Sequence, residues 1–332
     1  MTRCAVVGAG AWGSALADLL ARAGHTVTLW AFEPDVVAGV NARHENARFL
    51  RGVPLHAGVK ATSDVAGAVR DAELVLFVAP SHVLRAVARQ AAAAVATNAV
   101  LVVATKGVER GTLGLMTDVI GDELPGRPVV ALSGPSFAAE VAARQPTAVV
   151  AASAQHDAAE RAQVALSSDS FRVYTSDDVT GVEIGGALKN VIAVATGIAE
   201  GLGLGFNPRA ALITRGLAEI TRLGVALGAA PLTFAGLAGL GDLVLTCTGA
   251  LSRNRAVGLE IGRGAMLQDI LAGRETVAEG VVTTQSAHAL AIREGIAMPI
   301  VAAVHGILFE QQSPRAAIAA LMTRELRAER DA

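Results

Sequence analysis

The chain has 332 residues, of which 52% are hydrophobic and 17% charged, and its formal net charge is −2 at pH 7. This composition allows a large buried core and provides no overall attraction to polyanions. Nucleic-acid binding favours a basic stripe and stacking aromatics, but aromatic residues make up only 3% of the chain, so we expect no nucleic-acid partner. The length predicts about two domains.

Short apolar runs alternate with Ala-rich helical stretches through the first half of the chain. The predicted strands are residues 4–7, 26–30, 74–79, 100–105, 129–132, 148–152 and 171–174. Helical stretches at residues 12–23, 83–96 and 157–166 lie between several of them. Strands separated by helices indicate βαβ crossovers and a largely parallel sheet buried on both faces. The pattern predicts an α/β fold with a doubly wound sheet.

The pattern changes after about residue 180, where long Ala-, Leu-, Ile- and Gly-rich segments at helical spacing dominate. Within residues 182–198, Ile184, Leu188 and Ile192 belong to one apolar stripe of a predicted helix. We therefore expect a first domain at residues 1–185 and an all-helical second domain at residues 186–332. No low-complexity linker separates the two, which favours a well-packed cleft between them as the site.

Two segments imitate targeting signals. Arg3, the apolar run after it and the Ala15-Leu16-Ala17 triplet resemble a signal peptide, but cleavage there would remove the first strand of the predicted sheet. The apolar residues 179–199 include Glu183 and Lys189, which argue against a membrane span.

The two cysteines, Cys4 and Cys247, form no CxxC pair and no metal-type cluster. Together with the absence of a targeting segment, this favours a protein of a reducing compartment, the cytoplasm, over a disulfide-linked secreted one.

The GAGAWG motif at residues 8–13 follows the first predicted strand and begins a helix. Gly8 permits a tight turn, Gly10 lets a pyrophosphate approach the backbone, and Gly13 lets the helix pack on the strand. The free N–H groups at the helix start attract phosphates. A glycine motif alone is weak support, but its position between strand and helix predicts a Rossmann-like dinucleotide site.

This kind of site also uses a carboxylate about 20 residues further on to hold a ribose hydroxyl. Glu33 lies at that distance, directly after the second strand, with Phe32 beside it. The alternative is that Glu33 is an ordinary solvated loop residue.

Lys189 is the candidate proton donor and acceptor. It lies in the middle of a predicted apolar helix, so we expect it to be at least partly buried, and desolvation lowers the pKa of a lysine toward neutrality. Gly185 and Gly186, one turn earlier, leave room for a ligand. The alternative is a lysine that extends its amine to solvent. The seven histidines are scattered and indicate no metal site.

Other polar residues complete a candidate substrate site. Asp242 follows a glycine-rich loop, and Ser252, Arg253 and Asn254 are placed to begin a helix with Ser252 as its cap. A guanidinium, an amide and free N–H groups at a helix start favour phosphate binding, although each cluster is also compatible with an ordinary cap and turn. Lys106 follows a parallel strand, where α/β sheets bind ligands.

These motifs together resemble the bacterial NAD(P)-dependent glycerol-3-phosphate dehydrogenase family over nearly the whole chain. The similar segments are GAGAWG (8–13), VAPSHV (78–83), ATKG (104–107), SGPSFAAE (133–140), GGALKNVIA (185–193), ALITRGLAE (211–219), AGLGDLVLTCT (238–248) and SRNR (252–255). GGALKN and AGLGDLVLTCT are the most specific of them.

The resemblance implies a role for each matching residue, with Lys189 as the proton donor and acceptor. The implied substrate contacts are Lys106, Gly134, Ser136, Lys189, Asp242, Ser252, Arg253 and Asn254. The implied dinucleotide contacts are Ala11, Trp12, Lys106, Ala138, Arg253, Val277 and Glu279, beside the glycines of the turn. Members of the family often carry a basic residue or histidine where Phe32 stands, so this chain departs from the pattern that favours NADP.

The expected activity is therefore the interconversion of dihydroxyacetone phosphate and sn-glycerol 3-phosphate with NAD or NADP, supplying phospholipid synthesis. Phe32 and Glu33 predict that NADH works at least as well as NADPH, unless Arg43 or Arg48 folds back toward the ribose. The alternatives are another two-domain hydroxyacid dehydrogenase or a non-catalytic NAD-sensing protein. A homodimer is reasonable for the Ala-rich helical domain.

Overall fold

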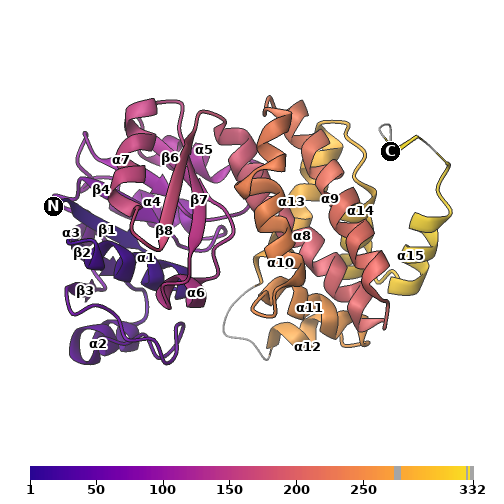
Figure 1. Ribbon diagram of the computed structural model, residues 1–332, viewed down its shortest axis with the longest axis horizontal. Coiled ribbons are helices and arrows are strands. Elements are labelled where there is room, and N and C mark those ends of the chain that lie inside the picture. Colours follow the sequence, from indigo (N-terminus) through magenta and orange to yellow (C-terminus); the bar gives the residue numbers. More distant parts are fainter. Residues whose placement is uncertain (273–277, 327, 330–332) are drawn as a thin grey trace.

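The computed structural model describes residues 1–272, 278–326 and 328–329. A sheet with helices on both faces forms the N-terminal half, and helices form the C-terminal half, so the two halves lie side by side along the long axis (Figure 1). The predicted combination of a Rossmann-like α/β half and a helical half is confirmed.

One eight-stranded sheet has the order β3-β2-β1-β4-β5-β6-β7-β8. The strands are β1 (Arg3–Val7), β2 (Thr26–Trp30), β3 (Val59–Thr62), β4 (Leu74–Phe77), β5 (Val100–Val103), β6 (Val129–Ser133), β7 (Thr147–Ala152) and β8 (Phe171–Ser176). All neighbours are parallel except β6 and β7, which are antiparallel. The prediction omitted β3, a four-residue edge strand whose Lys60 interrupts the apolar pattern.

Helices cover both faces of this sheet. They are α1 (Ala11–Arg22), α2 (Pro34–Arg43), α3 (Val65–Val69), α4 (Leu84–Ala91), α5 (Met116–Glu123), α6 (Ala138–Ala142) and α7 (His156–Leu166). Alternate strand residues point to opposite faces. Val6 and Leu76 therefore lie in the core under α1 and α7, whereas Val7 and Phe77 lie in the core under α3, α4 and α5. This two-sided burial explains the continuous apolar runs in the sequence.

The described part of the second half contains helices and turns. They are α8 (Val179–Gly201), α9 (Phe206–Ala226), the 3₁₀ turn η1 (Pro231–Ala235), the π-helical turn η2 (Leu237–Gly241), α10 (Asp242–Thr248), α11 (Arg253–Gly262), α12 (Leu267–Ala272), α13 (Glu279–Arg293), α14 (Pro299–Phe309) and α15 (Pro314–Met322). The central helix is α8, which contacts α9, α10, α11, α13 and α14, whereas α12 packs on α11 and α15 packs on α14 (Figure 1).

The central helix α8 is apolar and long enough to cross a membrane by length and composition alone, but its most apolar window is 100% buried inside the protein. It is the core helix of the second half. Its small residues allow close packing, because a Cβ at Gly197 would lie 2.1 Å from the Arg255 backbone oxygen of α11. The Gly-rich composition of this region therefore reflects helix contact at backbone distance.

The start of α8 also joins the two halves. Glu183, on α8, accepts hydrogen bonds from the backbone N–H (3.0 Å) and the hydroxyl of Thr117 on α5. Burial raises the pKa of Glu183 to about 7, although these hydrogen bonds act in the opposite direction. The predicted boundary after residue 185 falls inside this continuous helix and stays a prediction.

Candidate active site

The carboxyl ends of β1, β4, β5 and β6 lie at one edge of the sheet, because these strands are parallel neighbours. The loops that follow them carry Gly8, Lys106 and Gly134, and α8 passes the same edge with Lys189. Ligands of α/β sheets bind at this edge. The predicted residues from the two halves therefore meet here.

The glycine turn has the backbone geometry that a dinucleotide needs. Gly8 has φ of +122°, a conformation that glycine adopts without strain, and a Cβ at Gly13 would lie 1.8 Å from the Gly8 oxygen. A Cβ at Gly10 would have no neighbour within 4 Å, so the backbone there faces open space. No side chain caps the start of α1, which leaves its N–H groups for a phosphate.

The other predicted dinucleotide contacts surround this turn. Ala11 and Trp12 begin α1, which packs against α6, where Ala138 is the first residue. Phe32 and Glu33 follow β2 at the same edge, and the Phe32 side chain is 78% exposed. These positions are those expected for adenine and ribose contacts. Val277 lies outside the described residues.

A buried carboxylate on α10 binds the two predicted lysines. Asp242 is 1% exposed; one of its oxygens accepts from Lys189 Nζ and the other from Lys106 Nζ, the latter at 2.5 Å. Lys189 Nζ also donates to Thr246 Oγ1 at 2.9 Å, and Lys106 Nζ donates to the Gly134 oxygen at 3.2 Å. An ammonium has three donors, so each lysine has one N–H left for a ligand.

Burial decides the protonation chemistry of Lys189, which is 7% exposed, as the apolar pattern predicted. Desolvation lowers the pKa of Lys189 to about 8, and the Lys106 charge acts in the same direction. The Asp242 carboxylate opposes this by attracting the charged form. The result is an ammonium that releases and regains a proton close to neutral pH, which general acid–base catalysis requires.

Close backbone packing places these groups. A Cβ at Gly185 would lie 2.6 Å from the Ala238 oxygen, so only glycine lets the η2 turn rest on α8. Asp242 begins α10 directly after this turn, and the carboxylate thereby reaches Lys189 from a different helix. On the sheet side, Gly134 has φ of +144°, and the Ser136 hydroxyl donates to its oxygen at 3.0 Å.

The SRNR segment begins α11 as predicted. Ser252 caps the helix by accepting from the Arg255 N–H at 3.2 Å, and Arg253 is exposed. The Arg253 guanidinium has no hydrogen bond or ion pair to any described residue. Asn254 donates to Asn190 Oδ1 at 2.8 Å and accepts from the Gly280 N–H at 2.9 Å. It therefore connects α8, α11 and α13 beside Lys189.

Glu279, at the start of α13, contacts the sheet domain. Its carboxylate accepts two hydrogen bonds from Ser81, which lies in the loop after β4. The Ser81 hydroxyl donates at 2.7 Å and the Ser81 N–H at 3.4 Å. Burial raises the pKa of Glu279, while the hydrogen bonds from Ser81 lower it. The predicted dinucleotide contact thus holds a loop at the ligand-binding edge of the sheet.

Three residues of the site were missed from the sequence. Thr246 lies one helical turn after Asp242, and that spacing was a usable signal. Asn190 directly follows Lys189 within GGALKN, but its bond to Asn254 depends on the packing of α11. Ser81 gave no signal of its own, because its partner Glu279 is 198 positions away in the chain.

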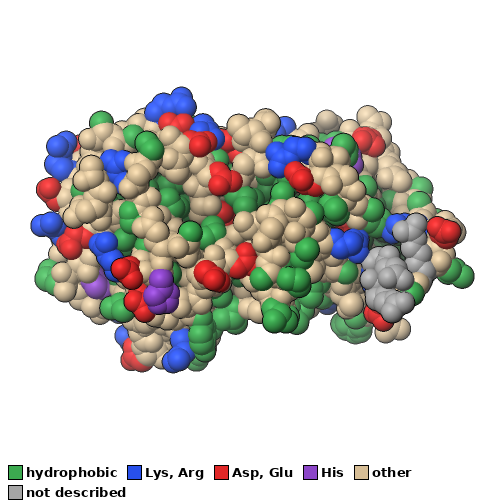
Figure 2. Space-filling view, turned by 90° about the horizontal axis from the view of Figure 1, so that it is seen from above, with side chains coloured by type: hydrophobic (Ala, Val, Ile, Leu, Met, Phe, Trp, Pro, Cys, Tyr) green, Lys and Arg blue, Asp and Glu red, His purple; other side chains and the backbone are tan. Residues whose placement is uncertain are grey.

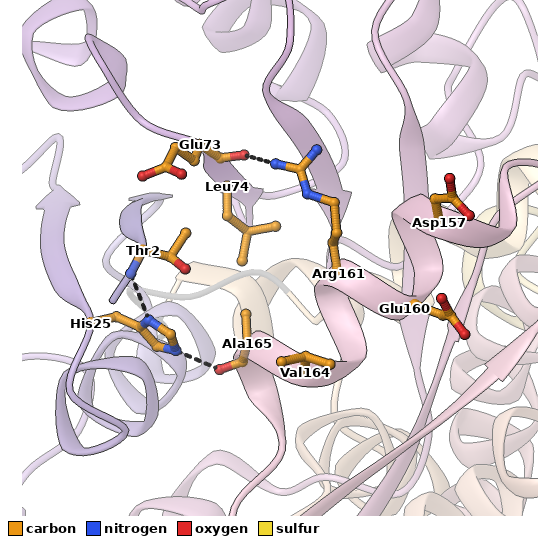
Figure 3. A pocket seen from close by; sticks show the side chains of 9 residues that line it. All are labelled: Thr2, His25, Glu73, Leu74, Asp157, Glu160, Arg161, Val164 and Ala165. Carbon is orange, nitrogen blue, oxygen red and sulfur yellow. Dashed lines mark hydrogen bonds between the residues drawn. The ribbon is translucent and has the colours of Figure 1, made fainter.

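A cavity of about 420 Å³ elsewhere in the molecule is not part of this site. It opens at the amino ends of β1 and β4, the opposite edge of the sheet, beside α7 (Figure 3). The Thr2 N–H donates to His25 Nδ1 there, and His25 Nε2 contacts the Ala165 oxygen. Arg161 donates to the Glu73 backbone oxygen. The His25 ring and the Arg161 guanidinium therefore already have partners within the cavity wall.

The surface seen from above carries charges of both signs. Basic and acidic side chains alternate over the face seen in Figure 2 and form no continuous basic stripe there. The described residues contain no group of three or more His, Cys, Asp or Glu side chains placed to hold a metal ion.

Two family models match the chain. The NAD-dependent glycerol-3-phosphate dehydrogenase N-terminus matches residues 3–159, and the corresponding C-terminus matches residues 178–319. A glycerol-3-phosphate dehydrogenase [NAD(P)+] of Citrifermentans bemidjiense is 52% identical over 330 residues, 98% of each chain. One of Geobacter metallireducens is 54% identical, again over 98% of each chain.

Solved structures agree with these matches. A glycerol-3-phosphate dehydrogenase of Coxiella burnetii has a TM-score of 0.94 at 41% identity, over 97% of this chain and 99% of that one. D-mandelate dehydrogenase, at 13% identity and a TM-score of 0.60, over 93% of this chain and 98% of that one, shares the fold alone. The chain belongs to the NAD-dependent glycerol-3-phosphate dehydrogenase family.

Proposed function

We propose that the protein reduces dihydroxyacetone phosphate to sn-glycerol 3-phosphate, reversibly, with NADH or NADPH. The observation that carries this proposal is the buried Lys189 ammonium, held by Asp242 and Thr246 at the ligand-binding edge of the sheet. Reduction of a ketone needs a proton donor within reach of the carbonyl oxygen. The remaining N–H of Lys189 supplies this proton donor, and the remaining N–H of Lys106 supplies an electrostatic contact.

When bound, the dihydronicotinamide would supply the hydride for C2 of the ketone. Lys189 Nζ gives its proton to the oxygen on C2, so the carbonyl becomes the hydroxyl of the product. In the oxidation direction neutral Lys189 accepts that proton. Asp242 keeps the amine oriented, and Lys106 orients the substrate from the sheet side together with Gly134 and Ser136.

The phosphate of the substrate is assigned to the start of α11. Arg253 has a guanidinium with no partner among the described residues, and the free N–H groups of the helix start lie beside it. Ser252 and Asn254 fix that helix start through the capping bond and the contact with α13. Binding energy at the phosphate positions the reacting carbon.

We also propose a cytoplasmic homodimer supplying phospholipid synthesis. Both cysteines are free and buried, which suits a reducing compartment. The helical half leaves Phe206 and Leu232 at least 80% exposed, which supports self-association through this half. Light scattering on the purified protein is expected to give twice the 33.7 kDa of one chain. A mass of one chain across a concentration series would contradict the dimer.

Replacing Lys189 with Met removes the proton donor and keeps the apolar stem. We expect kcat to fall by about 10²–10⁴-fold, while the Kd of NADH, measured by fluorescence titration, stays unchanged. Lys60→Met on the exposed edge strand β3 is the matched control and is expected to keep full activity. A Lys189→Met enzyme with near-normal kcat would contradict the assignment.

The lowered pKa of Lys189 predicts the pH profile of the parent enzyme. The protonated amine is the donor, so kcat/KM for reduction is expected to fall as pH rises through about 8, while kcat/KM for oxidation rises over the same range.

Replacing Arg253 with Ala tests the phosphate contact. We expect the KM for dihydroxyacetone phosphate to rise about 10–100-fold, and the KM for unphosphorylated dihydroxyacetone to change little. Arg255→Ala is the matched control on the same helix, because Arg255 is bound to Glu200 and serves the fold. If Arg253→Ala weakens both substrates equally, Arg253 does not bind the phosphate.

The cofactor preference follows from the loop after β2. Phe32 offers no charge to a 2′-phosphate and Glu33 repels one, so we expect kcat/KM for NADH to equal or exceed that for NADPH. Arg48 lies 3.5 Å from Asp35 at the start of α2, which brings one cation near this loop. Arg48→Ala is therefore expected to lower kcat/KM for NADPH only. A strong NADPH preference at matched ionic strength would refute the NADH prediction.

A further inference from the structure

A buried amide connects the segment between α2 and β3 to the glycine turn. Asn46 has no exposed surface, and its Nδ2 donates to the Ala9 backbone oxygen and to Ser14 Oγ, both at 2.8 Å. Its Oδ1 accepts from the Phe49 N–H at 3.1 Å. Ala9 is the middle residue of the Gly8-Ala9-Gly10 turn, 37 positions away from Asn46 in the chain.

Independent contacts hold the segment in place. Leu50 and Leu55 are buried in the core under α1, and the His56 N–H donates to the buried Asp18 carboxylate of α1 at 2.6 Å. The segment that follows Asn46 is therefore held by contacts other than those with the glycine turn. The Asn46 amide therefore has a fixed position from which it bonds to the Ala9 oxygen of the turn.

The bond to Ala9 orients the neighbouring N–H. Across a planar trans peptide bond, the C=O of one residue and the N–H of the next point in opposite directions. Asn46 holds the Ala9 oxygen toward the interior, so the Gly10 N–H points outward, where Gly10 is exposed and a Cβ would have no neighbour within 4 Å. That is the side from which a pyrophosphate approaches the turn.

The next peptide, between Gly10 and Ala11, is fixed by the helix. The Gly10 oxygen accepts from the Ser14 N–H at 2.9 Å, and Ser14 Oγ is the second acceptor of the Asn46 amide. One side chain thus links both ends of the first helical turn. Without it, the buried Ala9 oxygen would keep only the longer hydrogen bond from Ser14 Oγ, at 3.4 Å, and the loss of the amide is a cost that favours rotation of the peptide.

We infer that Asn46 is a positioning residue for dinucleotide binding: it fixes the Ala9–Gly10 peptide so that the Gly10 N–H faces the pyrophosphate before the ligand arrives. This inference rests on the proposed use of NADH or NADPH. Preorganised donors bind a ligand without an ordering cost, so loss of Asn46 weakens dinucleotide affinity and leaves the chemistry of Lys189 alone.

The test is Asn46→Ala in the full chain. The Kd of NADH, from fluorescence titration, is expected to rise about tenfold, with the KM of NADH rising in parallel. The kcat at saturating NADH and the KM of dihydroxyacetone phosphate are expected to stay within about twofold of the parent, because Lys189 and Arg253 are untouched. Hydrogen exchange of the peptide covering residues 8–14, without dinucleotide, is expected to become faster.

The matched control is Asn41→Ala on α2. Asn41 also makes two hydrogen bonds to backbone, donating to the Ala61 oxygen (2.9 Å) and accepting from its N–H (2.8 Å), but it does not contact the glycine turn. It is expected to lower the melting temperature without changing the Kd of NADH. If Asn46→Ala fails to fold, Asn46→Ser takes its place, since a serine hydroxyl is too short to reach Ala9.

An unchanged NADH Kd in the Asn46 variant would overturn the positioning role. So would an equal rise in the Asn41 variant, because the effect would then be one of stability. A parent protein that binds neither NADH nor NADPH would instead contradict the proposed function itself, which separates the two failures.

Discussion

The site depends on the ionic contacts that the Asp242 carboxylate makes with two lysines. The carboxylate lies between two ammonium groups, Lys106 from the sheet half and Lys189 from the core helix, and it is almost completely buried. Removing one partner of a buried ionic group leaves an uncompensated charge and is strongly destabilising. The two halves must therefore pack in one arrangement, because any displacement would separate this carboxylate from one of its cations.

Small residues make that arrangement possible. The Asp242 side chain reaches Lys189 because Gly185 lets the η2 turn lie against α8, and Lys106 approaches because Gly186 leaves space beside Ser133 and the lysine stem. The same property lets α11 pack against α8 at Gly197. The high Gly and Ala content thus serves close backbone contact around one long buried helix, and that helix carries the buried amine of Lys189.

Local sequence patterns were sufficient for seven of the eight strands, the glycine turn and the burial of Lys189, since each depends on neighbours within a strand or helical turn. They were not sufficient where the partner lies far along the chain. The contact of Asn46 with Ala9 and that of Glu279 with Ser81 join loops that only the folded sheet brings together. The edge strand β3 was missed because four residues with one exposed lysine carry little periodic signal.

Local charge placement also explains how a chain with a net charge of −2 accommodates a phosphorylated substrate. The candidate site has three cationic side chains, Lys106, Lys189 and Arg253. Asp242 neutralises one positive charge of the lysine pair. Burial raises the pKa of Glu279, and the nearby charge of Arg253 acts to lower it. The site thus keeps an excess of positive charge within a mixed surface (Figure 2). Since charges beyond about 8 Å are largely screened at physiological salt, this local excess acts on an entering anion more strongly than the net charge of the chain.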